Sequence, residues 1–494
     1  MMALKYQSTR DLNQTKITPT KAILSGLSHD GGLFVPDKLP KLDLTLTQLP
    51  HLSYQELAFK ILQPFFNDYP TEILRENIQK AYQTQWDTPE ITPLKSFGQV
   101  NYLELFHGPT LAFKDVALQL LPHLMLSANE LNHDQNEIVI LTATSGDTGK
   151  AAMAGFSDVS HTQIIVFYPK DGVSVIQERQ MLTQTGQNTH VLGLLGNFDD
   201  AQNEVKRLFN DPDLTATLLS RHQRFSSANS INIGRLFPQV VYYFFAYGRL
   251  LEKGVIKAGN QVNFSVPTGN FGDILAGWFA KNLGLPIHKL ICASNQNNVL
   301  YDFFNQGTYD KKRPFYVTNS PSMDILVSSN LERLLYYISG KDADLTQRLL
   351  SDLQKKGAYT ITENMQAQLR DFFADFADEK QTLAEIKRVY HEFNYLIDPH
   401  TAVASKAYQV YQEKTGDKRP TVILATASPF KFPQTVLNAL GVTSDDLTAL
   451  TKLADFTGIP VPAAIDGLFQ KPLLHHQVIS PMQMKETILA SLRA

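Results

Sequence analysis

The chain has 494 residues, which is too long for one hydrophobic core, so we expect about two or three domains. Its net charge of −3 and the lack of a basic run in either half argue against nucleic acid as a partner. The single cysteine, Cys292, excludes a disulfide within the chain and any cysteine-rich metal site, and we predict no bound metal.

Neither the N-terminus nor the most apolar stretch is typical of a secreted or membrane protein. Residues 1–7 lack the pattern of a signal peptide. The most apolar stretch, 236–251, is short and contains Pro238, Gln239 and Arg249, which favours a buried helix. We therefore expect a cytoplasmic protein without a membrane partner.

Residues 1–95 are predicted to form a separate N-terminal unit. Several turn-forming residues surround a short apolar strand within 26–37. Ser53 and Glu56 match a capping box ahead of an apolar helix over 57–66. A second helix is expected over about 71–84, and 87–93 has the composition of a linker.

From residue 96 onward, short apolar strands alternate with helices, which predicts βαβ units and mostly parallel sheets covered by helices. The almost continuously apolar run 137–144 is typical of a strand buried on both faces. We assign 96–235 to a smaller α/β domain and 236–494 to a larger one, with a cleft between them. Further strands are expected over 100–105, 163–168, 190–195, 262–266, 289–293 and 421–425. Further helices are expected over 114–121, 150–156, 175–185, from 199 or 200 to 209, 273–283 and 401–411, with turns and helices over 295–387.

One lysine lies where a turn should become a helix, in His107-Gly-Pro-Thr-Leu-Ala-Phe-Lys-Asp115. If Phe113 and Leu111 help to bury Lys114, its ammonium form loses solvation and its pKa falls. A neutral, buried amine is what Schiff-base chemistry requires. The alternative is an exposed lysine paired with the neighbouring carboxylate of Asp115, and the local pattern alone favours it.

Two glycine-rich loops are candidates for anion binding, Thr144-Ser-Gly-Asp-Thr-Gly-Lys150 and Pro267-Thr-Gly-Asn-Phe-Gly-Asp273. Each lies between a predicted strand and a helix, where open α/β sheets bind ligands and backbone N–H groups face anions. Their glycine spacing fits neither a nucleotide P-loop nor a dinucleotide fingerprint. An ordinary left-handed turn is the alternative for the second loop.

Two further loops carry polar side chains. Thr426 and Ser428 follow the strand expected over 421–425, although each hydroxyl could equally cap a helix. In the segment 226–235, Arg235 offers a bidentate fork suited to phosphate. A solvated loop with one arginine covering the next helix is the alternative.

Taken together, these segments resemble the threonine synthases, a family of pyridoxal-phosphate enzymes with the tryptophan-synthase-β-like α/β fold. The resemblance covers nearly the whole chain, and the N-terminal unit is similar to the extra domain of the family's long branch. The motifs that carry it are Asp30-Gly-Gly-Leu-Phe-Val-Pro, His107-Gly-Pro-Thr-Leu-Ala-Phe-Lys-Asp, Thr144-Ser-Gly-Asp-Thr-Gly, Ser227-Ala-Asn-Ser-Ile-Asn, Pro267-Thr-Gly-Asn-Phe-Gly-Asp, Ser320-Pro-Ser-Met-Asp-Ile and Asp398-Pro-His-Thr-Ala-Val-Ala.

The resemblance implies pyridoxal 5'-phosphate as the cofactor. Lys114 is implied to hold it as a Schiff base and then to move protons at the substrate Cα and Cβ. Thr426 is implied to hydrogen-bond the pyridine nitrogen, and Asp147 to lie near the ring hydroxyl. The cofactor phosphate is implied to bind Gly269, Asn270, Phe271 and Gly272.

The resemblance also implies the reaction. Phosphate is eliminated from O-phospho-L-homoserine and water adds at Cβ, which gives L-threonine. The implied ligands of the substrate carboxylate are Thr144, Ser145, Gly146 and Thr148. Those of the substrate phosphate are Asn229, Ser230 and Arg235. Such a substrate needs two anion sites besides that of the cofactor, and the sequence offers three candidate loops.

Some alternatives stay open. The residues do not separate this activity from a phospholyase that releases 2-oxobutanoate from the same substrate. A hydroxyamino-acid dehydratase would have no use for Arg235, and a non-catalytic binding protein none for Lys114. Ser428 stands where the family usually has histidine, so the role of that position is open. We leave His107 and His400 out of the site, and we expect a monomer.

Overall fold

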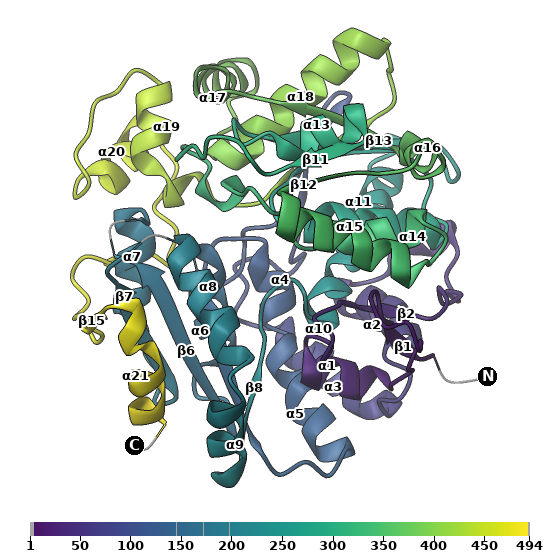
Figure 1. Ribbon diagram of the computed structural model, residues 1–494. Helices are drawn as coiled ribbons and strands as arrows, with labels where there is room; N and C mark the ends of the chain where they lie inside the picture. Colours follow the sequence, from purple (N-terminus) through teal and green to yellow (C-terminus); the bar gives the residue numbers. More distant parts are fainter. Residues whose placement is uncertain (1–3, 145, 171, 197, 493–494) are drawn as a thin grey trace.

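Two largely parallel sheets organise the chain (Figure 1). The computed structural model describes residues 4–144, 146–170, 172–196 and 198–492. The larger sheet has the strand order β13-β10-β9-β14-β4-β3, in which β3 is antiparallel to β4 and the other pairs are parallel. The smaller sheet, β15-β7-β6-β5-β8, is parallel throughout. The expected α/β class is confirmed.

The strands and helices follow the expected periodicity closely. The larger sheet contains β3 (Leu94–Phe97), β4 (Val100–Glu104), β9 (Val262–Pro267), β10 (Ile287–Ser294), β13 (Phe372–Phe376) and β14 (Thr421–Ala425). The smaller sheet contains β5 (Glu137–Ala143), β6 (Thr162–Pro169), β7 (Thr189–Leu194), β8 (Gln223–Ser226) and β15 (Val478–Ile479). The helices after residue 100 are α4 (Lys114–Leu118), α5 (Leu121–Leu131), α6 (Asp147–Phe156), α7 (Val175–Leu182), α8 (Phe198–Phe209), α9 (Pro212–Ser220), α10 (Ile233–Leu236), α11 (Pro238–Glu252), α12 (Gly272–Asn282), α13 (Val299–Gln306), α14 (Leu331–Ile338), α15 (Ala343–Lys356), α16 (Glu363–Ala367), α17 (Glu379–Phe393), α18 (Pro399–Thr415), α19 (Pro433–Ala439), α20 (Ala449–Thr457) and α21 (Met484–Ser491).

The N-terminal unit packs against the buried helix pair α10 and α11. It consists of β1 (Tyr6–Ser8), β2 (Phe34–Pro36), α1 (Pro19–Ser25), α2 (Tyr54–Phe65) and α3 (Thr71–Ala81). The capping box at Ser53 is present, because Ser53 Oγ accepts from Glu56 N at 3.3 Å and Glu56 Oε2 accepts from Ser53 N at 2.9 Å. The rings of Phe65 and Phe237 stack with centroids 4.0 Å apart, so this unit shares the apolar core of the larger domain.

Several elements differ from the sequence expectation, which did not include β3, β8, β15 or α9. The helix expected over 114–121 ends at Leu118, and α5 starts anew at Leu121 with Pro122 in its first turn, where proline's missing N–H is tolerated. The region 295–387 contains three short strands besides helices: β11 (Thr308–Asp310), β12 (Ala358–Thr360) and β13. These strands are too short to produce a clear alternation in the sequence.

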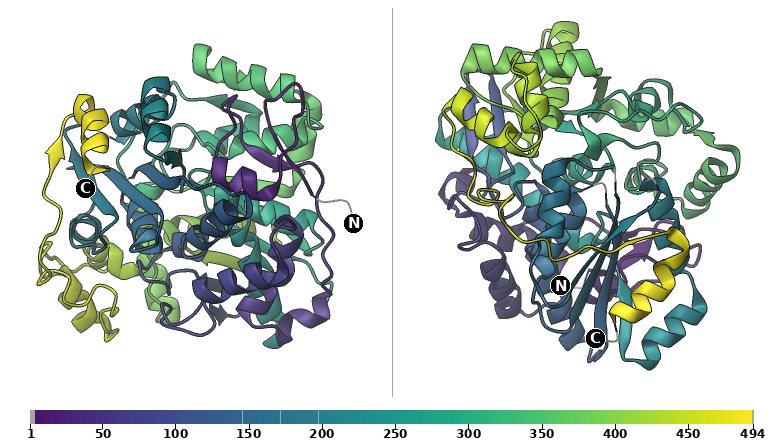
Figure 2. Two further views of the ribbon diagram at one scale, coloured as in Figure 1. Left: turned by 90° about the horizontal axis from the view of Figure 1, so that it is seen from below. Right: turned by 90° about the vertical axis from the view of Figure 1, so that its left-hand side faces the viewer.

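Hydrogen bonding crosses the domain boundary expected between 235 and 236 in two places. Strand β4 lies beside β14 in the larger sheet, with Leu103 opposite Leu424. The C-terminal segment returns to the smaller sheet, where β15 pairs with β7 (Figure 2, right). The division into 1–95, 96–235 and 236–494 stays a prediction, since the two sheets exchange segments across it.

The apolar stretch over 236–251 forms the end of α10 and most of α11, which is buried along nearly its whole length. Cys292 is fully buried in β10, and burial raises the pKa of its thiol to about 12, as expected of an unreactive core thiol. Among the residues that the structure describes, no helix has the length and apolar character needed to span a bilayer.

Candidate active site

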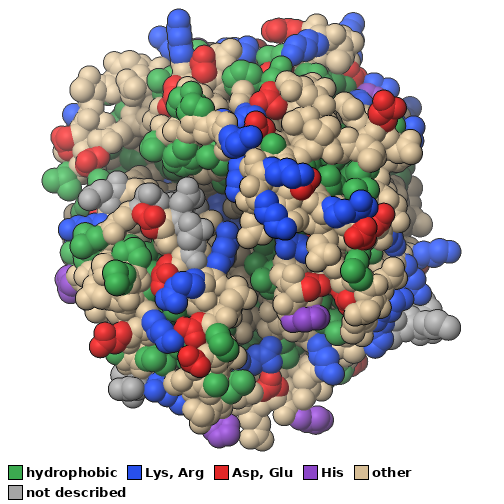
Figure 3. Space-filling view, viewed as in Figure 1, with side chains coloured by type: hydrophobic (Ala, Val, Ile, Leu, Met, Phe, Trp, Pro, Cys, Tyr) green, Lys and Arg blue, Asp and Glu red, His purple; other side chains and the backbone are tan. Residues whose placement is uncertain are grey.

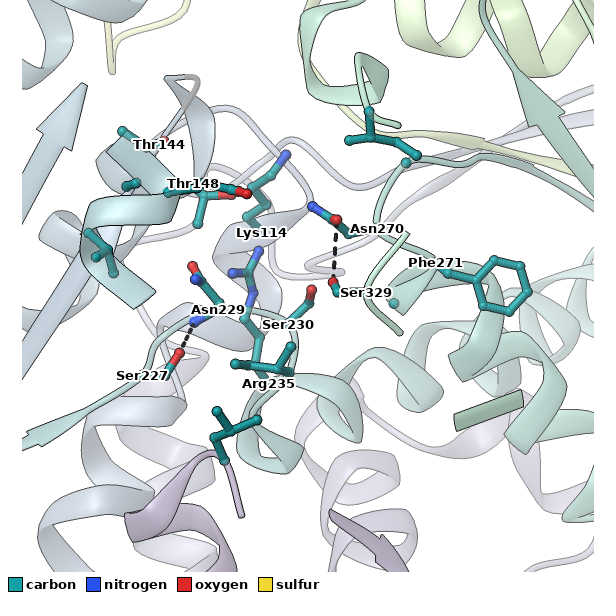
Figure 4. A pocket seen from close by; sticks show the side chains of 18 of the residues that line it. Lys114, Thr144, Thr148, Ser227, Asn229, Ser230, Arg235, Asn270, Phe271 and Ser329 are labelled. Carbon is teal, nitrogen blue, oxygen red and sulfur yellow. Dashed lines mark hydrogen bonds between the residues drawn. The ribbon is translucent and has the colours of Figure 1, made fainter. Parts of the chain in front are cut away.

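The loops singled out in the sequence converge at the carboxyl ends of the parallel strands. The ends of β4, β9 and β14 lead to one wall of a cavity of about 520 Å³, and those of β5 and β8 lead to the other. In Figure 4, Lys114 lies between Thr148 on one side and Asn270 on the other, with Arg235 below it. Ligand binding at this edge is expected of an open α/β fold. Figure 3 shows Lys and Arg side chains gathered along a hollow near the centre of one face, which favours anionic ligands.

The loop that carries Lys114 is held by the loop that carries Thr426. Phe113 N donates to Thr426 O at 2.8 Å, and Ser428 N donates to Leu111 O at 3.0 Å. Leu111 has a left-handed backbone with φ 60°, which turns the chain into α4. The hydroxyl of Thr426 has no hydrogen-bond partner among the described residues, and the residue lines the cavity. The two loops are therefore fixed relative to each other by main-chain bonds.

Lys114 is a buried lysine whose ammonium form is disfavoured. Its residue is 8% exposed, and Nζ lies 4.4 Å from the centroid of the Phe113 ring. Burial lowers the pKa of Lys114 to about 8, although the carboxylate of Asp147, 3.7 Å away, acts in the opposite direction. The exposed-lysine alternative is therefore wrong. Such an amine is a competent nucleophile near neutral pH.

Asp115 does not pair with its neighbour Lys114. It is fully buried, and its carboxylate accepts from Thr110 N at 2.8 Å and from Thr110 Oγ1 at 2.6 Å. Burial raises the pKa of Asp115 to about 6, although these hydrogen bonds oppose the shift. Its contribution is to close the Gly-Pro turn before α4.

Asp147 is held by two lysines, one of which the sequence analysis did not single out. Lys431 Nζ lies 2.7 Å from Asp147 Oδ1 and donates to Thr110 O at 2.9 Å. Burial opposes ionisation of Asp147, but Lys431 and Lys114 outweigh it and hold its pKa well below the ordinary value. Gln177 Nε2 donates to the same carboxylate at 2.9 Å and Ser322 Oγ at 3.2 Å. Lys431 follows Thr426 and Ser428 in the same loop, so its position in that loop was a sequence signal that could have identified it.

The N-terminus of α12 presents its backbone N–H groups to the cavity. The carbonyl of Gly269 accepts from Ser328 Oγ at 2.7 Å, and that of Asn270 accepts from Asn330 N at 3.0 Å. None of the N–H groups of 269–272 donates to another described residue. The left-handed residue in this turn is Phe271, with φ 66°, and not one of the glycines. Gly269 is needed because the backbone of another segment packs closely against it: a Cβ on Gly269 would lie 2.7 Å from Ser322 O.

The N-terminus of α6 uses its backbone N–H groups internally. Thr144 Oγ1 accepts from Gly146 N at 3.0 Å and from Gly149 N at 2.8 Å. Thr144 and Thr148 line the cavity, whereas Gly146 packs behind it against the side chain of Gln177. Ser145, the fourth residue expected here, lies outside the described residues.

Arg235 is a buried cation that faces the cavity between Asn229 and Ser230 (Figure 4). It is 4% exposed, and its Nη1 donates to Ala228 O at 2.9 Å. Burial lowers the pKa of Arg235 to about 10, so it stays charged at neutral pH. In the described part of the chain, no carboxylate forms an ion pair with it. A buried guanidinium without a counter-ion favours an anionic ligand.

The residues left out of the site fall in different places. His400 lines the cavity: its Nδ1 pairs with Asp398 at 2.7 Å, and its Nε2 accepts from Ser322 N at 3.1 Å. His107 lies outside the cavity wall and bonds to Asp87 at 2.5 Å and Glu104 at 3.0 Å. Ser428 Oγ accepts from Phe430 N at 3.3 Å, as a cap, and does not line the cavity.

These donors fit pyridoxal phosphate. Free N–H groups at the start of an 11-residue helix suit its phosphate, and Lys114 suits its aldehyde. The uncommitted hydroxyl of Thr426 suits its ring nitrogen. Among the described residues, no group of three His, Cys, Asp or Glu side chains is placed to hold a metal ion.

Three family models match the chain. "Threonine synthase N terminus" matches residues 5–82, "Pyridoxal-phosphate dependent enzyme" matches 92–427, and "Threonine synthase, C-terminal" matches 401–485. The middle model alone covers more than half of the chain and includes the cavity residues from Lys114 to Thr426.

Named relatives and a solved structure agree with these models. Human "Threonine synthase-like 1" is 41% identical over 88% of this chain, which spans 59% of that protein. The threonine synthase of Schizosaccharomyces pombe is 36% identical over 95% of this chain and 94% of that one. The crystal structure of pyridoxal-phosphate-bound threonine synthase from Brucella melitensis is 37% identical, with a TM-score of 0.87 and complete coverage of both chains. The chain belongs to the threonine synthase family of pyridoxal-phosphate-dependent enzymes.

Proposed function

We propose that this chain is a threonine synthase, which converts O-phospho-L-homoserine and water into L-threonine and phosphate. One observation carries the proposal. A buried lysine with a pKa of about 8 shares a cavity with a helix N-terminus whose N–H groups are free and with an unpaired, buried arginine. The helix N-terminus suits the phosphate of the cofactor, and the arginine suits the phosphate of the substrate.

We assign the cofactor to the wall formed by the larger sheet. When bound, pyridoxal phosphate withdraws electrons from the substrate Cα, which makes the protons at Cα and Cβ removable. Gly269, Asn270, Phe271 and Gly272 would hold its phosphate, and Thr426 its ring nitrogen. A hydroxyl at that nitrogen cannot protonate it as an acid would. Asp147, ionised between two lysines, would face the ring hydroxyl.

We assign the substrate to the opposite wall. Thr144 and Thr148 would bind its carboxylate, while Asn229, Ser230 and Arg235 would bind its phosphate. Thr142 Oγ1 donates to Asn229 Oδ1 at 2.9 Å, which fixes the amide and leaves Asn229 Nδ2 for a ligand. Arg235 would stabilise the charge that builds up on the departing phosphate.

Lys114 would hold the cofactor first and move protons afterwards. When it does not hold the cofactor, its amine, with a pKa of about 8, would accept and return protons near neutral pH. Its short distance to Asp147 gives the protonated form a partner 3.7 Å away.

Product analysis with O-phospho-L-homoserine tests the reaction. We expect threonine and phosphate in equal amounts. Ammonia and 2-oxobutanoate in place of threonine would identify a phospholyase of the same site, and no turnover by protein with bound cofactor would favour a binding protein.

Two variants test the assignments. We expect Lys114→Ala to lose the visible absorbance band of the bound cofactor that borohydride abolishes, and to lose turnover. We expect Arg235→Ala to keep that band but to use phosphohomoserine far less efficiently. Simultaneous loss of the cofactor from Arg235→Ala would argue against its assignment to the substrate phosphate.

We further propose that the chain acts as a monomer. Light scattering of the holoenzyme tests this: a stable dimer would contradict it. A cytoplasmic location stays a prediction.

A further inference from the structure

The start of helix α14 carries two fully buried polar side chains to which no role has been given. Asn330 and Arg333 are both 0% exposed, although asparagine and arginine are rarely buried completely. They lie in Ser328-Ser-Asn-Leu-Glu-Arg333, within the region for which the sequence indicated no chemistry. Buried polar groups of this kind are retained when their hydrogen bonds are specific.

Asn330 bridges the two loops assigned to phosphates. Its Nδ2 donates to Ser230 Oγ at 2.9 Å and to Asn270 O at 3.1 Å, and its backbone N donates to Asn270 O at 3.0 Å. The loops also touch directly, because a Cβ on Gly272 would lie 3.2 Å from Ser230 Cβ. One amide group therefore fixes the distance between the two loops.

Arg333 fixes the orientation of that amide. Its Nη1 donates to Asn330 Oδ1, so the oxygen faces Arg333 and the nitrogen faces the loops. The guanidinium also donates to Ser230 O at 3.5 Å, to Ile231 O, and through Nε to Phe34 O at 2.9 Å. Phe34 belongs to β2, so the arginine connects the substrate loop to the N-terminal unit.

The bonds of Arg333 go to neutral oxygens. In the described residues it forms no ion pair, and burial lowers the pKa of its guanidinium to about 10, which leaves it charged at neutral pH. A lysine could not replace it, because only the planar fork donates in three fixed directions. The positive charge of Arg333 also lies behind the two loops that we assign to anions.

We propose that Asn330 and Arg333 are positioning residues that couple the substrate-phosphate loop to the cofactor-phosphate loop. Phosphate bound at one loop orders that loop, and because Asn330 is bonded to both loops, the other loop is ordered with it, so the second phosphate binds more tightly. The inference rests on the proposed function, since it takes 229–235 and 269–272 as phosphate sites. It adds that the sites are energetically linked and that the N-terminal unit takes part.

The test is a binding cycle on the apoprotein. The Kd of pyridoxal phosphate is measured by absorbance with and without a saturating phosphonate analogue of the substrate, whose amine is acetylated so that it cannot react with the cofactor. In the wild type we expect the analogue to tighten cofactor binding about 5-fold or more. The same cycle with pyridoxal, which lacks the phosphate, should give no coupling.

Asn330→Ala and Arg333→Lys should each reduce the coupling factor to about 1, while the borohydride-sensitive band of Lys114 remains. Asn77→Ala is the matched control. Asn77 is also buried, and its Nδ2 donates to Ser127 Oγ at 3.0 Å, remote in sequence from both loops. It should lose comparable stability but keep the coupling.

The outcomes separate the two proposals. An analogue whose own affinity does not depend on Arg235 would overturn the proposed substrate site. If the analogue depends on Arg235 and the wild type shows coupling, but Asn330→Ala and Arg333→Lys retain it, the positioning role is wrong and the proposed function stands. Equal loss of coupling in Asn77→Ala would reduce the effect to general destabilisation and would also overturn the inference. If Asn330→Ala does not fold, Arg333→Lys decides.

Discussion

Helix α6 begins at Asp147, directly after Gly146, and helix α12 begins with Gly272 and Asp273; both aspartates are buried in the cavity wall, yet their pKa values are shifted in opposite directions. Asp147 lies between Lys431 and Lys114, and its pKa is held well below the ordinary value despite burial. Asp273 Oδ1 accepts from Tyr242 OH at 2.5 Å and from Tyr243 OH at 3.0 Å. Burial raises the pKa of Asp273 to about 6, although the two tyrosines oppose the shift.

The two helix starts also differ in whether their backbone N–H groups are already hydrogen-bonded within the protein. At α6 the N–H groups of Gly146 and Gly149 are taken by Thr144 Oγ1, so side chains face the ligand. At α12 the N–H groups of 269–272 donate to no described residue, so the main chain is available to a ligand. A permanent negative charge suits the first site, where two lysines need a partner. It would oppose a phosphate at the second, where a carboxyl with a raised pKa carries less charge.

The largest effect is expected from Asp147→Asn. It leaves Lys431, which is fully buried, without a carboxylate, and breaking such a pair typically costs about 3–5 kcal/mol. Urea unfolding of the apoprotein measures the loss. Removing the negative charge should also lower the pKa of Lys114 below about 8, which the pH dependence of its reaction with pyridoxal measures.

Asp344→Asn is the control for this prediction, because Asp344 forms an exposed pair with Arg348 at 3.0 Å. Such pairs contribute little to stability. If the two substitutions lowered stability by similar amounts, the buried ion pair of Asp147 would contribute no more to stability than an exposed one.

The second effect distinguishes the glycines of the two loops. Gly269→Ala places a Cβ 2.7 Å from Ser322 O, a backbone atom that cannot move away cheaply. Overpacking of this kind costs about 1–3 kcal/mol, which we expect to appear as cofactor affinity weakened roughly 10- to 100-fold. Titration of the apoprotein with pyridoxal phosphate measures it.

Gly146→Ala should act differently. Gly146 has φ 118°, which L residues rarely adopt, and its Cβ would meet the side chain of Gln177 at 2.5 Å. We expect a loss of about 1–3 kcal/mol in folding stability with little change in cofactor affinity. Equal losses of cofactor from both variants would contradict the assignment of the cofactor phosphate to α12 alone.

Sequence reasoning succeeded where a function depends on neighbours in the chain. The strand-end loops are predictable because apolar strands, turn residues and helix starts are local signals, whereas the burial of Lys114 is not, since its local pattern alone favours an exposed side chain. It failed where the partner comes from elsewhere. Lys431 reaches Asp147 across 284 positions of the numbering, and Asn330 joins loops that precede it by 60 and 100 residues. The role of Thr144 was also hidden, since a hydroxyl that caps a turn and one that binds a ligand look alike in sequence.

The third prediction concerns the pH dependence of stability. The folded pKa of Asp273 is raised to about 6, above its unfolded value, so its contribution to stability is present below the unfolded pKa and is lost as pH rises through about 6. Asp273→Asn removes this loss. Its stability relative to the wild type should therefore improve by about 2–3 kcal/mol between pH 4 and pH 7, because the pKa is raised by about two units and one unit is worth about 1.4 kcal/mol.

Thermal unfolding of the apoproteins across this range is the measurement, with the holoenzyme excluded because cofactor binding adds its own pH dependence. A relative stability that is flat with pH would show that Asp273 is ionised throughout. The two helix starts would then carry the same charge.

The smallest effect is expected from Thr144→Val, which keeps the shape of the side chain and removes its oxygen. The N–H groups of Gly146 and Gly149 lose their acceptor, and the loss of such a cap costs about 1 kcal/mol. Because we assign Thr144 and Thr148 to the substrate and not to the cofactor, we expect the KM for phosphohomoserine to rise severalfold while the Kd of pyridoxal phosphate stays unchanged. Thr144→Ser keeps the hydroxyl and should restore the KM. If the serine variant behaved like the valine variant, the methyl group, and not the oxygen that closes this helix start, would be the part that matters.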